Sequence, residues 1–454
     1  MKRIFTILIV GVCLASCESF LELDAPKTQI ITAKVFENDA GARAALAGVY
    51  SQLMSGTTFA SGGAIGITTI AALSADELDN HSTSADRTAI YDNSLTPVNS
   101  VSSLWSDMYF TIYQANAILE GMQASSAITA DVKEQIVGQA LFIRAFAYFY
   151  LVNLYGDVPL LLSTDYRINS KMPRTSIVEV YEQIEGDLRK SQSMLIADYS
   201  FSKGEKVEPN RSAATALLAR AYLYQQKWAD AEMQASSIIE DPQFSLVPDL
   251  NSVFLANSSE AIWQLMPVLP GHNTFDGPYF YGEYEVVDVS VTSSLLEDFE
   301  PGDNRLSSWI ANAVVGDLNY NYANKYKVIF SDMPLTEYQM VFRLAEQYLI
   351  RAEARAMQGN LSEAIDDINV IRSRAGLGPI DATGLSQQQV IDAIQKERRS
   401  ELFIEWGHRW FDLKRWGKID EVLSAVKPGW QSKDAVFPIP QSEINANPNL
   451  KQNP

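Results

Sequence analysis

Two segments far apart in the sequence carry the same pattern of paired helices. Apolar residues recur at spacings of three and four over 210–239 and again over 344–371, and each run is interrupted once near its middle. Equivalent positions hold a small residue, then a large and a small one nine and twelve positions later: Ala219, Trp228 and Ala231 in the first run, and Ala352, Leu361 and Ala364 in the second. Small residues where two helices touch, with large residues that fill the gap, are typical of tetratricopeptide repeats.

The repeat is imperfect. Arg355 stands where the first run has Tyr222, a position at which the pattern favours an aromatic ring, and the two runs are too far apart to be tandem copies. Asn210 and Asn360 are suitable N-caps for the helices that follow them, and Glu363 would complete a capping box with Asn360. We therefore expect helix pairs separated by long insertions rather than a regular solenoid.

These patterns predict a mostly α fold. Another helix is predicted over 131–154, because its apolar residues have helical spacing and Gly156 and Pro159 follow it. Two segments differ in character: 55–103 is rich in Gly, Ser, Thr and Asn, and 243–335 carries Pro, Gly, Asn and many aromatics, with weak strand signals at 260–266 and 284–291. We expect these two to be loop-rich insertions with a few short strands, on the ligand side of a single domain over 17–454. The tetratricopeptide-like scaffold of helix pairs would cover roughly 30–54, 104–240 and 336–430.

The N-terminus has the layout of an export signal. Lys2 and Arg3 precede an apolar run over 4–14 that is too short to span a bilayer, so residues 1–16 are interpreted as a signal peptide. The sequence Leu-Ala-Ser-Cys that ends at Cys17 resembles the lipobox of bacterial lipoproteins, in which the thiol is acylated and becomes the new N-terminus. An ordinary cleavage site with a chance cysteine is the alternative. We find no other stretch long and apolar enough to cross a membrane, and expect attachment by the lipid only.

The charge balance restricts the partners that the chain can bind. The formal net charge is −19, and it becomes −21 when Lys2 and Arg3 leave with the signal peptide. Such a surface repels phosphate backbones, so nucleic acid is not an expected partner. The three histidines are scattered, and the sequence contains no HExxH, CxxC or GxSxG motif. We therefore predict no metal site, no cofactor and no catalytic residue.

Three segments together resemble the signature segments of a known family. Residues 140–161 (ALFIRAFAYFYLVNLYGDVPLL), 396–417 (KERRSELFIEWGHRWFDLKRWG) and 435–454 (AVFPIPQSEINANPNLKQNP) are similar to those of the SusD/RagB family of outer-membrane lipoproteins. The resemblance implies a tetratricopeptide-like half and a more variable half that holds the ligand. It also implies a lipid-anchored position on the outer membrane facing the cell exterior, and a SusC-type TonB-dependent transporter as the partner that the lipoprotein covers as a lid.

The function implied by this resemblance is capture of a nutrient and its delivery to the transporter, without bond chemistry. An oligosaccharide is the favoured ligand, and a peptide, as for a RagB-type receptor, is an alternative. A secreted glycoside hydrolase is a second alternative, because 55 acidic residues leave room for a suitable pair of carboxylates. A purely structural lid or adhesin is a third.

A dense charged stretch near the C-terminus has two interpretations, a catalytic or anion-binding cluster or a buried ion-pair network. We favour the network, because the planar fork of arginine suits carboxylates and its aliphatic stem packs on rings. The same interpretation is given to Arg144 and Asp157, and Trp105 is assigned to the core. The stretch contains Arg398, Arg399, Glu401, Glu405, Arg409, Asp412, Lys414 and Arg415.

Sugar binding requires exposed aromatic rings for apolar C–H faces and polar side chains for hydroxyl groups. Segments 75–93 and 270–285 supply both, and 318–326 adds tyrosines. Any one of these rings could instead pack onto the scaffold. The candidate ligand-binding residues are Asp79, Asn80, His81, Arg87, Tyr91, Asn273, Tyr279, Tyr281, Tyr284 and Tyr320.

Overall fold

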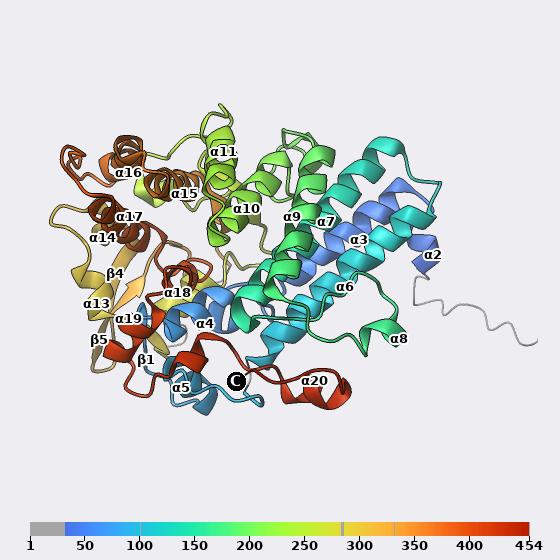
Figure 1. Cartoon of the computed structure of the whole chain (residues 1–454), viewed down its shortest axis with the longest axis horizontal. Helices are drawn as coiled ribbons and strands as arrows, with labels where there is room; N and C mark the ends of the chain where they lie inside the picture. The colour runs from blue at the N-terminus through green and yellow to red at the C-terminus, as the bar shows by residue number, and fades with distance from the viewer. Residues whose placement is uncertain (1–31, 100, 283–285, 331, 454) are drawn as a thin grey trace, which may run out of the picture.

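The computed structural model describes residues 32–99, 101–282, 286–330 and 332–453, most of which are helical (Figure 1). The predicted mostly α fold is confirmed. The long helices pack side by side in the order α6, α7, α9, α10, α11, α15 and α16, with α3 against α6 and α7, and α17 against α15. The helices of this scaffold are α2 Thr32–Val35, α3 Asp39–Leu53, α6 Ser102–Ala124, α7 Ala130–Tyr155, α8 Tyr166–Asn169, α9 Ile177–Met194, α10 Arg211–Tyr224, α11 Trp228–Ile239, α15 Leu344–Met357, α16 Leu361–Arg374, α17 Gln387–Leu402, α18 His408–Arg415, α19 Ile419–Val426 and α20 Gln441–Ala446.

The two predicted helix pairs are α10 with α11 and α15 with α16, and the helix predicted over 131–154 is α7. Asn210 caps α10 as expected, because its Oδ1 accepts a hydrogen bond from the Ala213 N–H at 3.0 Å. The capping box predicted at Asn360 is wrong. The backbone there (φ −83°, ψ 68°) departs from the extended conformation of a capping residue, and the side chain makes no capping hydrogen bond.

The two helix pairs are neighbours in space although a long insertion separates them in sequence, because α11 packs against α15. Arg355 lies at this junction. Its Nε donates to Glu232 of α11 at 2.9 Å, and its Nη1 donates to Asp367 of α16 at 2.9 Å. The arginine therefore joins three helices at the position where a tetratricopeptide repeat would have an aromatic ring.

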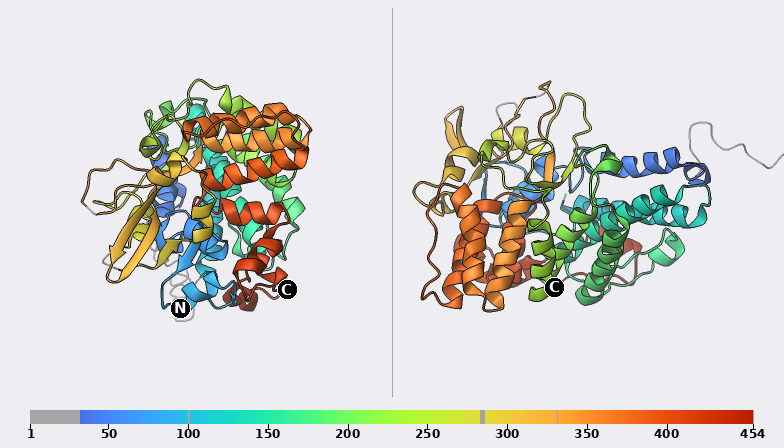
Figure 2. Two further views of the ribbon diagram at one scale, coloured as in Figure 1. Left: turned by 90° about the vertical axis from the view of Figure 1, so that its left-hand side faces the viewer. Right: turned by 90° about the horizontal axis from the view of Figure 1, so that it is seen from above.

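The insertions contain more helix than the sequence predicted. Helix α4 escapes detection because all eight of its residues are buried, so it has no amphipathic pattern. The strands form three antiparallel pairs, β1 with β3, β2 with β6 and β4 with β5, and the β4–β5 hairpin projects from the molecule in the left view of Figure 2. The elements of the insertions are η2 Gly63–Ile65, α4 Ile67–Ser74, β1 Leu78–Asn80, α5 Ala85–Tyr91, η4 Leu250–Ser252, β2 Ala261–Leu265, α12 Asp276–Tyr281, β3 Val289–Val291, α13 Ser293–Glu297, α14 Asn304–Trp309, β4 Ile310–Val315 and β5 Leu318–Ala323. Outside them lie η3 Ser200–Ser202, β6 Gln339–Arg343 and η6 Ser432–Ala435.

Helix α7 forms the centre of the core. By length and composition alone it could cross a membrane, contrary to our expectation that no stretch after the signal peptide could. Its most apolar 18-residue window, however, is 94% buried inside the protein. Its aromatic residues meet the strand pair β2–β6: Phe146 lies edge-on to Trp263, with ring centroids 5.2 Å apart, and packs against Phe342. Trp105 is buried, as predicted. The scaffold and the insertions therefore share one aromatic core.

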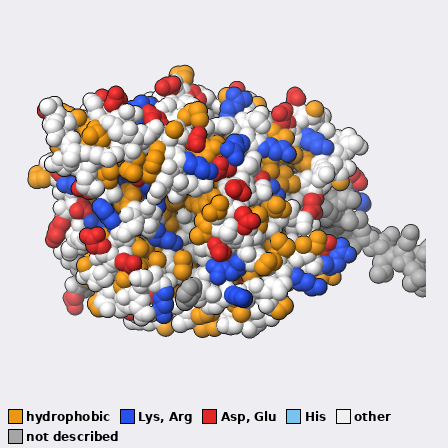
Figure 3. Space-filling model, viewed as in Figure 1, with side chains coloured by type: hydrophobic (Ala, Val, Ile, Leu, Met, Phe, Trp, Pro, Cys, Tyr) orange, Lys and Arg blue, Asp and Glu red, His pale blue; other side chains and the backbone are white. Residues whose placement is uncertain are grey.

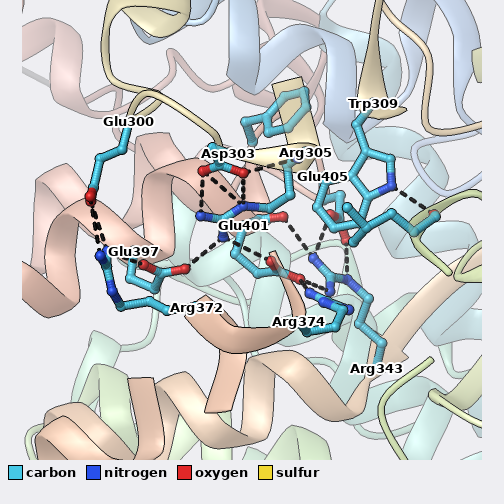
Figure 4. A network of polar contacts seen from close by, with 12 residues as sticks. Glu300, Asp303, Arg305, Trp309, Arg343, Arg372, Arg374, Glu397, Glu401 and Glu405 are labelled. Atoms are coloured by element: carbon cyan, nitrogen blue, oxygen red, sulfur yellow. Dashed lines mark hydrogen bonds and ion pairs between the residues drawn. The ribbon is translucent and has the colours of Figure 1, made fainter. Parts of the chain in front are cut away.

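The charged C-terminal stretch forms a buried ion-pair network, as predicted (Figure 4). Glu401 is completely buried, and its carboxylate accepts hydrogen bonds from Arg305 of α14, Arg343 of β6 and Arg374 of α16. Burial opposes ionisation of Glu401, but the three guanidinium groups outweigh it and hold its pKa well below the usual range. Glu405 pairs with Arg343 and Lys325. The network thus ties the insertion 243–335 to the scaffold.

Two neighbouring sets of charges extend the network. Arg398 and Arg415 share Asp412, and Arg415 also pairs with Glu353 of α15. Arg399 and Arg409 share Asp76, which lies between α4 and β1. The first set links α15, α17 and α18 to one another. The second fixes the start of the candidate ligand-binding segment to the scaffold.

Two charged residues do not fit the predicted network. Lys414 has no carboxylate partner among the described residues, and its ammonium donates to the Asn153 carbonyl at the end of α7. Asp157 accepts a hydrogen bond at 2.9 Å from the N–H of Ile177, the first residue of α9, whose N-cap is Ser176. Arg144, which was interpreted in the same way as Asp157, does form a buried pair, with Asp187 at 2.7 Å.

Candidate functional site

Arg87 and Tyr279 come together although 75–93 and 270–285 are distant in sequence. The guanidinium of Arg87, on α5, lies 5.5 Å from the centroid of the Tyr279 ring, on α12. Both side chains are half-buried. Of the five N–H donors of Arg87, only one of those on Nη1 has an acceptor among the described residues, the Ala64 carbonyl at 2.6 Å. The arginine therefore keeps donors for a ligand beside an aromatic ring.

The hydroxyl group of Tyr279 is unusual. Its oxygen is buried and has no hydrogen-bond partner among the described residues. Burial raises the pKa of Tyr279 to about 12, an effect that the nearby Arg87 reduces and Asp288 increases. Tyr279 thus exposes part of its apolar ring while its hydroxyl points inward. Such a residue is better placed to stack on a ligand than to form hydrogen bonds with it.

Asp79 and Tyr91 are also brought together, but they are tied to the scaffold. The hydroxyl of Tyr91 donates to Asp79 Oδ1 at 3.2 Å, and the ammonium of Lys427 lies 3.4 Å from the centroid of the Tyr91 ring. Lys427 also donates to the Leu73 carbonyl at 3.1 Å. One face of the Tyr91 ring is therefore covered, which leaves this residue less suited to stacking than Tyr279. Sequence reasoning did not identify Lys427, because only the folded chain brings it to α5.

Asn80 and His81 shape the end of β1. The Asn80 side chain exchanges hydrogen bonds with the backbone of Ser82, at 3.1 and 3.3 Å. The exposed His81 has its Nε2 2.8 Å from Ser290 Oγ, and its N–H donates to the Asp288 carbonyl at 2.8 Å. Both residues are accessible in part, and Asp288 on the adjacent strand segment is a half-buried carboxylate that sequence reasoning missed.

The remaining candidates divide into one partly exposed ring and two buried residues. Tyr281 is half-exposed and lies edge-on to Tyr322 and to the exposed Phe330. Tyr320 is only 4% exposed, and its hydroxyl donates to the Tyr281 carbonyl, so it packs beneath the binding surface and holds the end of α12. Asn273 is 3% exposed, and its Oδ1 accepts from the backbone of Thr336 and Glu337. Tyr284 and Cys17 lie outside the described residues.

The candidate residues that remain accessible form a binding face. It is built by α5, β1, α12 and β5: Arg87 comes from α5, and Tyr279 and Tyr281 both lie on the short helix α12. Figure 3 shows acidic and basic side chains interspersed over the side of the molecule seen in Figure 1, with no large field of one sign there. Partly exposed rings beside guanidinium, imidazole and amide groups can bind a ligand that has apolar faces and a hydroxyl rim.

Comparison with known proteins identifies the family. A family model described as "Starch-binding associating with outer membrane" matches residues 36–223, and a second, described as the SusD family, matches residues 299–435. The chain belongs to the SusD/RagB family. This confirms the resemblance carried by the three signature segments. Proteins of the SusD family are associated with the outer membrane.

Relatives of known sequence and structure support the same assignment over nearly the whole chain. A SusD-like protein of Formosa agariphila is 27% identical over 96% of this chain and 95% of its own length. A SusD superfamily protein of Bacteroides thetaiotaomicron has a crystal structure with a TM-score of 0.80 and 26% identity, covering 92% of this chain and 100% of that one. A laminarin-binding SusD-like protein has a TM-score of 0.76 and 25% identity, covering 92% and 99% of the two chains.

Proposed function

We propose that this protein binds an oligosaccharide at the face formed by Arg87 and Tyr279, and that it delivers the glycan to a SusC-type TonB-dependent transporter. A lipid on Cys17 would hold it on the outer membrane, facing the cell exterior. The observation that carries the ligand part is the pairing of a partly exposed tyrosine ring with a guanidinium group, most of whose donors have no acceptor within the described part of the chain.

The chemistry of a sugar matches this pairing. A pyranose ring can place its C–H face on Tyr279 while its hydroxyl oxygens accept hydrogen bonds from Arg87. A hydrogen bond to a charged group contributes about 1.5–3 kcal/mol, which corresponds to roughly a 10- to 150-fold change in affinity. The laminarin-binding relative supports a glycan over a peptide as the ligand.

Binding without cleavage is part of the proposal. A glycoside hydrolase needs two carboxyl groups on either side of the scissile bond. On this face Asp79 is held by Tyr91, and Asp276 is 2% exposed and engaged by backbone and amide donors. These contacts favour a structural role for both carboxylates over general acid or base chemistry.

Calorimetry tests the proposal. Protein lacking residues 1–17, which keeps every described residue, is titrated with laminarin, starch, other soluble polysaccharides and a peptide digest. We expect heat from at least one glycan, and a loss of roughly 10-fold or more in affinity for Arg87→Ala and for Tyr279→Ala. Tyr113→Ala is the matched control, because Tyr113 is a tyrosine on α6 that is 50% exposed and belongs to the opposite part of the scaffold.

Three outcomes would redirect the assignment. Shortened products after incubation with a bound glycan would favour a hydrolase. Heat from peptides alone would favour a peptide receptor. Heat from neither, with continued co-purification of a transporter from solubilised membranes, would favour a structural lid. Failure of the transporter to co-purify from cells that express both would contradict the delivery step.

A further inference from the structure

A glycine-rich loop packs against the first turn of α12. Gly62 and Gly63 both adopt left-handed backbone conformations, with φ of +81° and +67°. A Cβ atom at Gly62 would lie 2.6 Å from Oδ1 of Asp276, so only glycine allows this approach. The loop therefore lies in direct contact with the buried carboxylate of Asp276.

Asp276 holds this loop in place. Its Oδ1 accepts a hydrogen bond from the Gly63 N–H at 2.7 Å, and its Oδ2 accepts from Nε2 of Gln339, on β6, at 2.8 Å. Lys325 lines the same small cavity, but its ammonium is engaged by Glu405 and two backbone carbonyls. No cation pairs with Asp276 among the described residues, and burial raises its pKa to about 6. A carboxylate kept at this cost is expected to have a positional task.

The contacts made by the loop return to α12. The Ala64 carbonyl, one residue after Gly63, accepts the hydrogen bond from Arg87 at 2.6 Å. Arg87 in turn lies beside the ring of Tyr279, which is three residues after Asp276 on α12. The contacts therefore form a closed circuit from Asp276 through the loop and Arg87 back to the same helix.

We infer that Asp276 is a positioning residue for the binding face: it clamps the loop 61–66 and thereby fixes Arg87 relative to Tyr279. The consequence for glycan affinity rests on the proposed function, whereas the clamp itself can be measured without a glycan. Asp276 does not face the ligand, so its effect must pass through Arg87.

The structure supplies a conservative variant. Oε1 of Gln339 is buried and has no partner among the described residues. In Asp276→Asn the new amide oxygen can still accept from Gly63, and its NH₂ group can donate to Gln339 once that amide turns over. Asp276→Ala loses both hydrogen bonds. Gly62→Ala attacks the clamp from the loop, without changing Asp276.

The experiment is NMR of ¹⁵N-arginine-labelled protein lacking residues 1–17. The Nε–H signal of Arg87, identified by its absence in Arg87→Lys, reports the position of the guanidinium beside the Tyr279 ring. We expect the signal to shift or broaden in Asp276→Ala and in Gly62→Ala, and to keep its position in Asp276→Asn. An unmoved signal in both Asp276→Ala and Gly62→Ala overturns the inference, and if Asp276→Ala does not fold, Gly62→Ala decides.

Laminarin binding by calorimetry then separates the clamp from the proposed function. If Asp276 acts through Arg87, the double variant Arg87→Ala with Asp276→Ala loses no more affinity than Arg87→Ala alone, because the two effects share one path. Losses that multiply contradict that path. An unmodified protein that binds neither laminarin nor any other glycan refutes the proposed function, while the arginine spectra still decide the clamp.

Discussion

Replacing Glu401 by glutamine tests the buried network at the carboxylate that pairs with three arginines. The glutamine keeps the size of the side chain but removes its charge, and its NH₂ group points a donor toward guanidinium groups. Arg305 keeps Asp303 and Glu397, and Arg343 keeps Glu260 and Glu405. Arg374 keeps Glu260 alone, at 2.9 Å, and its Nε already has no partner among the described residues. Arg374 is therefore the residue that loses most.

Removing one partner of a buried ion pair costs about 3–5 kcal/mol, because the remaining charge is left uncompensated. We expect Glu401→Gln to lower the free energy of unfolding by about this amount in urea denaturation followed by circular dichroism. Asp392→Asn is the matched control, since Asp392 is exposed and lies 3.7 Å from Lys418. A surface pair of this kind contributes about 0–1 kcal/mol.

A second variant separates loss of charge balance from loss of packing. Adding Arg374→Met to Glu401→Gln removes the guanidinium that the first exchange leaves poorly paired. We expect part of the lost stability to return, so that the two changes are not additive. A loss below about 1 kcal/mol in Glu401→Gln, or a double variant no more stable than the single one, would refute the reasoning.

Four further predictions follow from individual residues. Glu401 has a folded-state pKa below its unfolded value of 4.5, so the stability it contributes is present above that pH and is lost as the pH falls. In urea denaturation at decreasing pH, the difference in free energy of unfolding between the unmodified protein and Glu401→Gln should therefore shrink below pH 4.5. Burial, with help from the Asp76 carboxylate, raises the pKa of Glu77 to about 8, so the folded state retains a proton that the unfolded chain releases above pH 4.5. The free energy of unfolding should therefore fall as the pH rises from 4.5 to about 8, and a flat pH profile of the unmodified protein would contradict this. Glu77→Gln should remove the slope and add on the order of 3 kcal/mol of stability at pH 7. A Cβ at Gly121 would lie 2.1 Å from the Phe36 ring, so Gly121→Ala should lower the free energy of unfolding by about 1–3 kcal/mol in urea denaturation. Gly186→Ala, on α9 with nothing within 4 Å of the new Cβ, should raise it by about 0.5–1 kcal/mol in the same assay. Cys17→Ala should move the protein out of the membrane fraction, and its retention there would indicate another anchor.

The helical scaffold could be predicted because its information is local. Spacings of three and four, small residues at helix contacts and terminal glycines are all visible in a short window. The charged signature residues were assigned to a buried network from their side-chain chemistry alone. Their partners Arg305, Arg343 and Arg374 were not identified, because these arginines come from three separate elements that only the folded chain brings to Glu401.

The insertions were predicted less well for two physical reasons. Helix α4 is buried on every side, so its sequence ITTIAALS lacks the periodic pattern on which helix prediction depends. The β4–β5 hairpin did leave a signal, a two-residue Gly-Asp loop between segments that both favour strand, but 318–326 was interpreted only as a source of aromatic side chains.

The residue types of the candidate site could be predicted from the sequence, but the contacts that decide which of them are accessible could not. Arg87 and Tyr279 were both named from composition. Their pairing depends on the loop at Gly62 and on the buried Asp276, whose contacts join three segments distant in sequence. Asn273 and Tyr320 have the residue types of sugar-binding side chains but are buried, Asn273 against 334–337 and Tyr320 against α12. A single sequence does not separate these cases.

A crystal structure of the protein with a bound oligosaccharide, chosen from the glycans that give heat in calorimetry, would show whether Tyr279 and Arg87 form the binding site. We expect an intact glycan with one sugar ring over Tyr279 and hydroxyl oxygens within hydrogen-bonding distance of the Arg87 guanidinium. A glycan bound on another face of the molecule, or found cleaved in the crystal, would contradict it.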